Sequence, residues 1–510
     1  MNASRRLFSY SLAFAGLLIV LWATRGLLVL VVSTVILRSA TLMGAADLRS
    51  RASFYLAALI VGTPLWLSFW LAAQRRAASV PEERGSIDRR AFFGALFVVT
   101  SLVVLFALQR LLRSLLSVPG ARESQSPTQE GIEAAARLLI FGGAWLAHAR
   151  IGWRERRPAD ADEWHDMAIY VVSGVALGML AIGAGQALSQ LLGDLLGARQ
   201  PAVLAGPAGF VWSIWGSIGA RIIAGGTVWA AVWQYDLRRG GSSELRVGYL
   251  YLVLAAAIPT AVGGGQSGLH EVLRRLFGYP AMVEGWSFLR GAISTLVIGA
   301  CLWVYHWQVL RRLAAQAGIR PAEAAGGIVW PRRPVIAMLV LLGLGMWAPA
   351  VVSILWLGLD FLLNTARTLS GAGWWRDQLS FSIAAALIGG AVWIGSWTIL
   401  QRAAAAAPAQ ERTVDERRRL LGMIVLITAL AVVGFTIALL WMLLQTLLGA
   451  RLASSEVSNM LKSLSGALVL LVLLAYHGTI LRRDRALAGP RARPVRVVAL
   501  VAPGAEAVLT

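Results

Sequence analysis

The sequence predicts an all-α protein: a polytopic transmembrane helix bundle of about twelve spans, built as six parallel tandem two-helix repeats. Three observations predict this fold, namely the composition, the length of the apolar runs, and a motif that recurs about every 80 residues. Of the 510 residues, 57% are hydrophobic and 14% are charged, whereas soluble domains carry about 25% charged residues. This composition excludes an ordinary soluble domain.

The apolar runs are long enough to cross a bilayer. A helix needs roughly 20 mostly apolar residues to cross about 30 Å of hydrocarbon. Twelve such runs lie near residues 7–37, 53–73, 91–116, 132–150, 167–196, 210–236, 247–277, 286–311, 334–364, 377–401, 420–448 and 456–482. Twelve spans would place both ends of the chain on the same side of the membrane.

The net charge of +21 comes from arginines that cluster in the short segments between spans. Most of them follow the even-numbered spans, and positive loops mark the cytoplasmic side. We therefore expect a multi-pass protein of the cell (plasma) membrane with both termini in the cytoplasm. Because no basic soluble domain is present, we expect no nucleic-acid partner.

The even-numbered spans end alike, which divides the chain into repeats. Residues 66–76 read WLSFWLAAQRR, residues 303–312 read WVYHWQVLRR, and residues 393–402 read WIGSWTILQR. The equivalent positions predict two-helix units at residues 1–79, 80–158, 159–241, 242–318, 319–407 and 408–485, followed by a basic tail at 486–510. Since each unit crosses the membrane twice, all six would run parallel, unlike the inverted repeats of many transporters.

Two of these motifs carry a resemblance to a known family. The first helix of the fourth unit contains Leu250–Val253 (LYLV), and the second contains Trp303–Trp307 (WVYHW). They resemble the LYLYLV-like and WxxHW-like helices of a bacterial membrane domain family that occurs in tandem copies. That family is catalogued only as a domain of unknown function. The resemblance covers most of the chain and implies no activity, ligand or catalytic residue.

Aromatic and histidine side chains recur near the predicted cytoplasmic ends of the even-numbered spans. Such side chains are typical interface anchors, since one end is apolar and the other is polar. The predicted anchors are Trp70, His148, Trp233, His306, Trp307, Trp397 and His477. The alternative is a ring of histidines on a metal or proton path. We expect no metal, because no carboxylate accompanies the histidines at ligand spacing.

A second recurring position lies about 20 residues into the odd-numbered spans. It holds Arg25, Arg110, Gln186, Gln266 and Ser353. Polar groups at membrane depth are expensive and often functional. Two interpretations stay open, because these side chains could reach the outer headgroups or could face a shared interior.

The seventh span has an unusual sequence, AAAIPTAVGGGQSGLHE at residues 255–271. Proline removes a backbone donor and glycine weakens a helix, so this span is predicted to break. Broken helices often line binding sites, which makes a candidate site of Pro259, Gly263, Gly264, Gly265, Gln266, His270 and Glu271, with Arg25, Arg110 and Gln186. The alternative is close helix packing through small residues.

No catalytic pattern was found in the sequence, so we predict neither an enzyme nor a cofactor. The function that the sequence favours is a non-enzymatic membrane scaffold or sensor-like bundle. Its expected partners are membrane lipids and, as a further option, another membrane protein. The alternative is a small-solute transporter or channel with a site near the broken seventh span.

Overall fold

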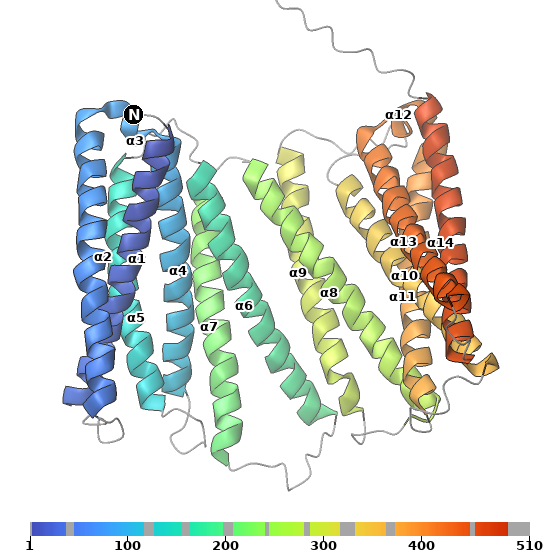
Figure 1. Cartoon of the computed structure of the whole chain (residues 1–510), viewed down its shortest axis with the longest axis horizontal. Helices are drawn as coiled ribbons and strands as arrows, with labels where there is room; N and C mark the ends of the chain where they lie inside the picture. Colours follow the sequence, from blue (N-terminus) through green and yellow to red (C-terminus); the bar gives the residue numbers. More distant parts are fainter. Residues whose placement is uncertain are drawn as a thin grey trace, which may run out of the picture. The chain divides into compact units, whose positions relative to one another are not determined.

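Twelve long helices form the described part of the protein (Figure 1). The computed structural model describes residues 3–36, 45–116, 127–155, 163–196, 208–239, 244–279, 286–316, 332–363, 373–448 and 454–487. The long helices are α1 (Ala3–Val31), α2 (Ala45–Ser79), α4 (Ile87–Leu116), α5 (Pro127–Glu155), α6 (Glu163–Leu195), α7 (Ala208–Arg239), α8 (Glu244–Leu276), α9 (Arg290–Gln316), α10 (Arg332–Leu362), α11 (Trp374–Ala406), α13 (Asp415–Leu447) and α14 (Ser454–Leu487). A short π-helical turn, η1 (Val32–Ile36), continues α1, and a 3₁₀ turn, η3 (Ser287–Leu289), precedes α9.

Each long helix covers one of the twelve predicted apolar runs. Most extend a few residues beyond their run, because charged residues at the ends still continue the helix. Ten of them are long and apolar enough to span a membrane, which indicates a membrane protein. The two that fall short are α5 and α7, and α5 carries Glu133 and Arg137 along its length.

Two compact units divide the chain. The first contains residues Met1–Gly268 and Ala281–Leu313, and the second contains Leu269–Pro280 and Ala314–Thr510. In the first unit α1 packs on α2, α4 on α5, and α6 on α7, while α4 also contacts α6 and α7. In the second unit α10 packs on α11, α13 on α14, and α10 also contacts α14. The two helices of each of these five pairs, from α1 with α2 to α13 with α14, follow one another in the sequence.

Two very short helices begin with proline, α3 (Pro81–Arg84) and α12 (Pro408–Glu411). Proline suits the first helical position, because the missing N–H would have no partner there anyway. Each of these helices buries a glutamate that pairs with an arginine at the start of a long helix. Glu83 lies 3.6 Å from Arg6 of α1, and Glu411 accepts a 2.8 Å hydrogen bond from Arg333 of α10.

The predicted break in the seventh span is wrong. Helix α8 is continuous from Glu244 to Leu276 with Pro259 inside it. A Cβ at Gly264 would overlap the backbone of Leu296 on α9, whereas one at Gly263 or Gly265 would meet open space. Gly264 is therefore a point at which α8 packs closely on α9. Close helix packing through small residues was the alternative to a broken helix.

Candidate functional site

Three arginines are buried at the starts of helices. Arg89, Arg246 and Arg417 are each the third residue of their helix, in α4, α8 and α13, and Arg89 has no exposed surface. A buried guanidinium is tolerated only when its charge is paired and its N–H groups are bonded. The partners of these three arginines therefore identify the parts of the helix bundle that each one holds together.

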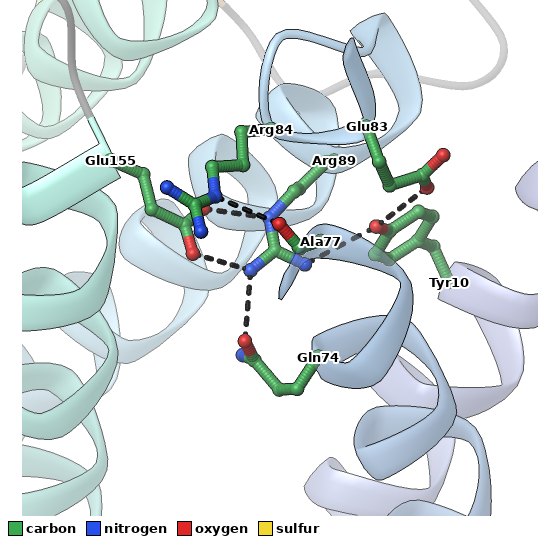
Figure 2. Close-up of polar contacts among 7 residues, drawn as sticks. All are labelled: Tyr10, Gln74, Ala77, Glu83, Arg84, Arg89 and Glu155. Carbon is green, nitrogen blue, oxygen red and sulfur yellow. Dashed lines mark hydrogen bonds and ion pairs between the residues drawn. The ribbon is translucent and has the colours of Figure 1, made fainter. Parts of the chain in front are cut away.

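Arg89 connects four helices (Figure 2). Its Nε and Nη2 donate to the two carboxylate oxygens of Glu155 on α5, at 2.7 and 2.6 Å. Nη2 also donates to Gln74 on α2 at 3.1 Å, and Nη1 donates to the Tyr10 hydroxyl on α1 at 3.3 Å. Tyr10 in turn donates to Glu83 of α3 at 3.1 Å. Bidentate pairing fixes direction as well as distance, so this cluster sets how the four helix ends meet.

Arg417 repeats this arrangement in the second unit. Its Nε donates to Asp484 on α14 at 2.8 Å, and its Nη2 donates to Gln401 on α11 at 3.1 Å. Its Nη1 donates to the backbone carbonyl of Leu400 at 3.1 Å. Asp484 and Gln401 stand at the places that Glu155 and Gln74 take around Arg89. Arg417 thus joins three helices, α11, α13 and α14, through side chains that correspond to two of the partners of Arg89.

Arg246 is also paired with a carboxylate, but its partner stands at a different position of the repeat. Its Nε donates to the Asp236 carboxylate on α7 at 2.8 Å, and its Nη2 donates to the Asp236 backbone carbonyl at 2.7 Å. The Tyr170 hydroxyl of α6 donates to the other carboxylate oxygen at 3.0 Å. Leu313 occupies the sequence position of Glu155. The counter-charge has moved to a neighbouring helix, while the buried pair is kept.

Beside each buried arginine, a tryptophan of one helix pair contacts a histidine of the next. The ring centroids are 5.3 Å apart for Trp70 and His148, 6.3 Å for Trp233 and His306, and 5.1 Å for Trp397 and His477. The sequence predicted these six residues and Trp307 as interface anchors. The structure instead buries all six inside the bundle, and only Trp307 is half-buried. Their helix face meets a neighbouring helix.

The three histidines share one hydrogen-bond geometry. Each Nδ1 lies 2.8 Å from the carbonyl oxygen four residues earlier, in Ala144, Leu302 or Leu473. A carbonyl only accepts, so Nδ1 is the donor, and a neutral ring carries its lone pair on Nε2. For His306 and His477 this nitrogen is buried and meets no hydrogen-bond donor in the described parts of the chain.

Two of the tryptophans also bond to a tyrosine. The indole N–H of Trp233 donates to the Tyr305 hydroxyl at 2.8 Å, and that of Trp397 donates to Tyr476 at 2.9 Å. Both tyrosines precede the cluster histidine by one residue. The first cluster has Ala147 at this position, so it lacks the equivalent bond.

Replacing Tyr476 by phenylalanine is expected to lower the free energy of unfolding by about 1 kcal/mol, because the Trp397 indole loses its acceptor. The measurement is the detergent-denaturation midpoint of purified protein, in a double-mutant cycle with Trp397→Phe. A coupling energy of zero between the two substitutions would contradict the bond.

Three of the five residues at the recurring polar position bond to a side chain of another helix, and Ser353 is one of them, accepting from Ser382 of α11 at 2.9 Å. Arg25 donates to Glu133 on α5 at 2.5 Å, and Gln186 accepts from Arg221 on α7. Gln266 is 7% exposed and its amide nitrogen has no acceptor among the described residues. Arg110 is exposed. Pairing with a neighbouring helix, α5 for Arg25 and α7 for Gln186, accounts for these two residues.

His270 and Glu271, near the end of α8, lie in a small cluster of charged and polar side chains with Arg274 and Asp377. Glu271 accepts from Arg274 at 3.1 Å, and Arg274 also lies 2.7 Å from Asp377 of α11. The Nε2 of His270 lies 3.2 Å from the same carboxylate. In the described residues, no group of three or more His, Cys, Asp or Glu is arranged to hold a metal ion.

The sequence interpretation missed the three buried arginines. It treated Arg89 and Arg417 only as members of basic clusters that mark the cytoplasmic side. A local signal was present, because the segments IDR, ELR and DER each place an acidic residue one or two positions before the arginine at a helix start. Burial depends on packing, however, and composition does not report it.

The threefold occurrence of the cluster agrees with a comparison against protein families. The model of one family, described as Domain of unknown function (DUF5671), matches residues 6–143, 166–285 and 333–503. Each match contains one buried arginine and one cluster tryptophan. No curated protein and no solved structure matches the chain. The matched segments cover most of the 510 residues, and the chain therefore belongs to this family of domains of unknown function.

Proposed function

We propose that this protein is a non-enzymatic scaffold or sensor-like bundle of the cell membrane. In this proposal all twelve long helices cross the membrane as six parallel two-helix units, and both termini are cytoplasmic. Its partners are membrane lipids and another membrane protein. The observation that carries the proposal is the buried arginine cluster, which occurs three times. It uses charged groups to hold helix ends together rather than to line a path through the bundle.

The continuous α8 weakens the transporter alternative, which depended on a broken helix. The recurring polar residues Arg25 and Gln186 are bonded to neighbouring helices, so they contribute to packing. A rigid bundle with an apolar exterior suits a protein that organises others in the bilayer. Exposed large apolar side chains along α13, such as Leu430, Ile437 and Leu444, supply that exterior.

Crosslinking in native membranes, followed by purification in mild detergent and mass spectrometry, tests the scaffold role. We expect one membrane protein to be recovered in stoichiometric amount. Reconstitution into liposomes loaded with ions and small metabolites is the opposing test. Protein-dependent solute flux without a recovered partner would overturn the scaffold role in favour of a transporter.

Cysteine labelling tests on which side of the membrane the termini lie. Cys301 is the single cysteine of the chain, so its replacement gives a background without other thiols. In a Cys301→Ala background, a membrane-impermeant maleimide added to intact cells should label Gln200→Cys. It should label Gly241→Cys only after the cells are opened, because residues 240–243 follow an even-numbered span. The reverse pattern would place the termini outside.

A further inference from the structure

A pocket lies beside the first arginine cluster, between α4, α5 and the start of α6. Its volume is about 410 Å³, which falls within the range of small-molecule sites. His148 and Arg89 form part of its wall, and His165 of α6 contributes from the neighbouring helix. The pocket is therefore built entirely within the first unit of the chain.

The pocket lies where the first cluster lacks a leucine that the other two clusters have. The residue four positions after the cluster histidine is Leu310 in the second cluster and Leu481 in the third, and both are buried. The first cluster has Gly152 at this position, and Gly152 lines the pocket. A Cβ there would meet the Phe93 ring at 3.6 Å, an ordinary contact. Helix packing therefore does not require glycine at this position. What the glycine does is leave space in the pocket.

The charges around the pocket favour an anion. Four arginines line it (Arg84, Arg89, Arg90 and Arg154), against two glutamates (Glu82 and Glu155). Glu155 is bound by Arg89 in a bidentate pair. Arg84 and Arg90 make hydrogen bonds to backbone carbonyls, and these bonds leave their charges uncompensated. Four arginines against two glutamates give the pocket lining a net charge of +2.

The rest of the wall is aromatic. Phe93, Phe97, Trp145 and Trp153 line the pocket. The indole N–H of Trp145 is buried and donates to no acceptor in the described residues. A buried donor without a partner is costly, and a bound acceptor would satisfy it. The occupant thus needs both an apolar body and an acceptor group.

We propose that this pocket binds a phosphate monoester attached to an apolar body. A phosphate monoester carries about −1.5 to −2 charges near neutral pH, which matches the net charge of +2 of the lining. Its oxygens suit the planar fork of arginine, while the body stacks on the aromatic wall. Phosphatidic acid and soluble aryl phosphates share this chemistry. The site goes beyond the scaffold role and does not depend on it.

Binding to the full chain in phosphatidylcholine nanodiscs tests the proposal. One arm titrates 1-naphthyl phosphate by calorimetry, with inorganic phosphate as the comparison. The other arm counts bound phosphatidic acid by native mass spectrometry, with the diester phosphatidylglycerol as the comparison. Tighter binding of the monoester in either arm supports the site, and the arm that responds identifies the source as soluble or lipid.

Two pairs of variants locate the binding. Gly152→Leu fills the pocket with the side chain of the other clusters and should weaken binding at least tenfold, whereas Gly143→Leu on the same helix lies outside the pocket and should not. Arg154→Gln, at an exposed position that leaves the fold intact, should weaken binding about tenfold, and Arg150→Gln should leave it unchanged. Absence of monoester preference in both arms, or undiminished binding by Gly152→Leu and Arg154→Gln, would overturn the proposal.

Discussion

Replacing Arg417 by methionine is expected to lower the free energy of unfolding by about 3–5 kcal/mol, because the buried Asp484 loses its hydrogen-bonded counter-charge and keeps only Arg412, at 4.0 Å. The Arg417 and Asp484 side chains are 3% and 2% exposed, so water cannot compensate for the lost pair. Unfolding by sodium dodecyl sulfate in mixed micelles, followed by circular dichroism, gives the measurement.

Two further variants separate the buried pair from general effects of charge removal. Arg419→Met removes an exposed charge from the same helix and should change the unfolding free energy by less than about 0.5 kcal/mol. The double variant Arg417→Met with Asp484→Leu should recover most of the loss, because an apolar pair can replace a buried ion pair. If the double variant is as unstable as Arg417→Met alone, the stability comes from the remaining hydrogen bonds of Arg417, to Gln401 and Leu400, and not from the ion pair.

The second large effect is expected at Gly264. An alanine Cβ there would overlap the backbone nitrogen of Leu296, so α8 and α9 must move apart. We expect Gly264→Ala to lower the free energy of unfolding by about 1–3 kcal/mol, the usual cost of overpacking. The same detergent titration measures it.

The neighbouring glycine supplies a matched control. Gly265→Ala places its Cβ in open space, and it should stabilise the helix by up to about 1 kcal/mol, because alanine is the better helix former. Equal destabilisation by both substitutions would mean that the glycine run itself, and not the contact with α9, is what the helix requires.

The positions of the helices could be predicted because membrane helices leave a strong local signal. All twelve long helices coincide with predicted apolar runs, and the resemblance to a tandem family of unknown function is confirmed.

Whether the helix breaks at Pro259 could not be predicted from the residues around it. A proline removes one hydrogen bond, yet α8 is continuous and packs on α9 at Gly264, against a residue more than 30 positions away in the sequence.

The sequence by itself determined that this is a helical membrane protein with recurring aromatic, histidine and arginine residues. Only the tertiary structure decided which of these face inward. Trp397 and His477 lie 80 residues apart, and their rings meet edge to face only because two helix pairs pack together. Arg417 becomes a buried group only because Asp484 and Gln401 meet it from other helices. Burial and pairing are properties of contacts between distant segments, whereas hydropathy and helix position are properties of local sequence.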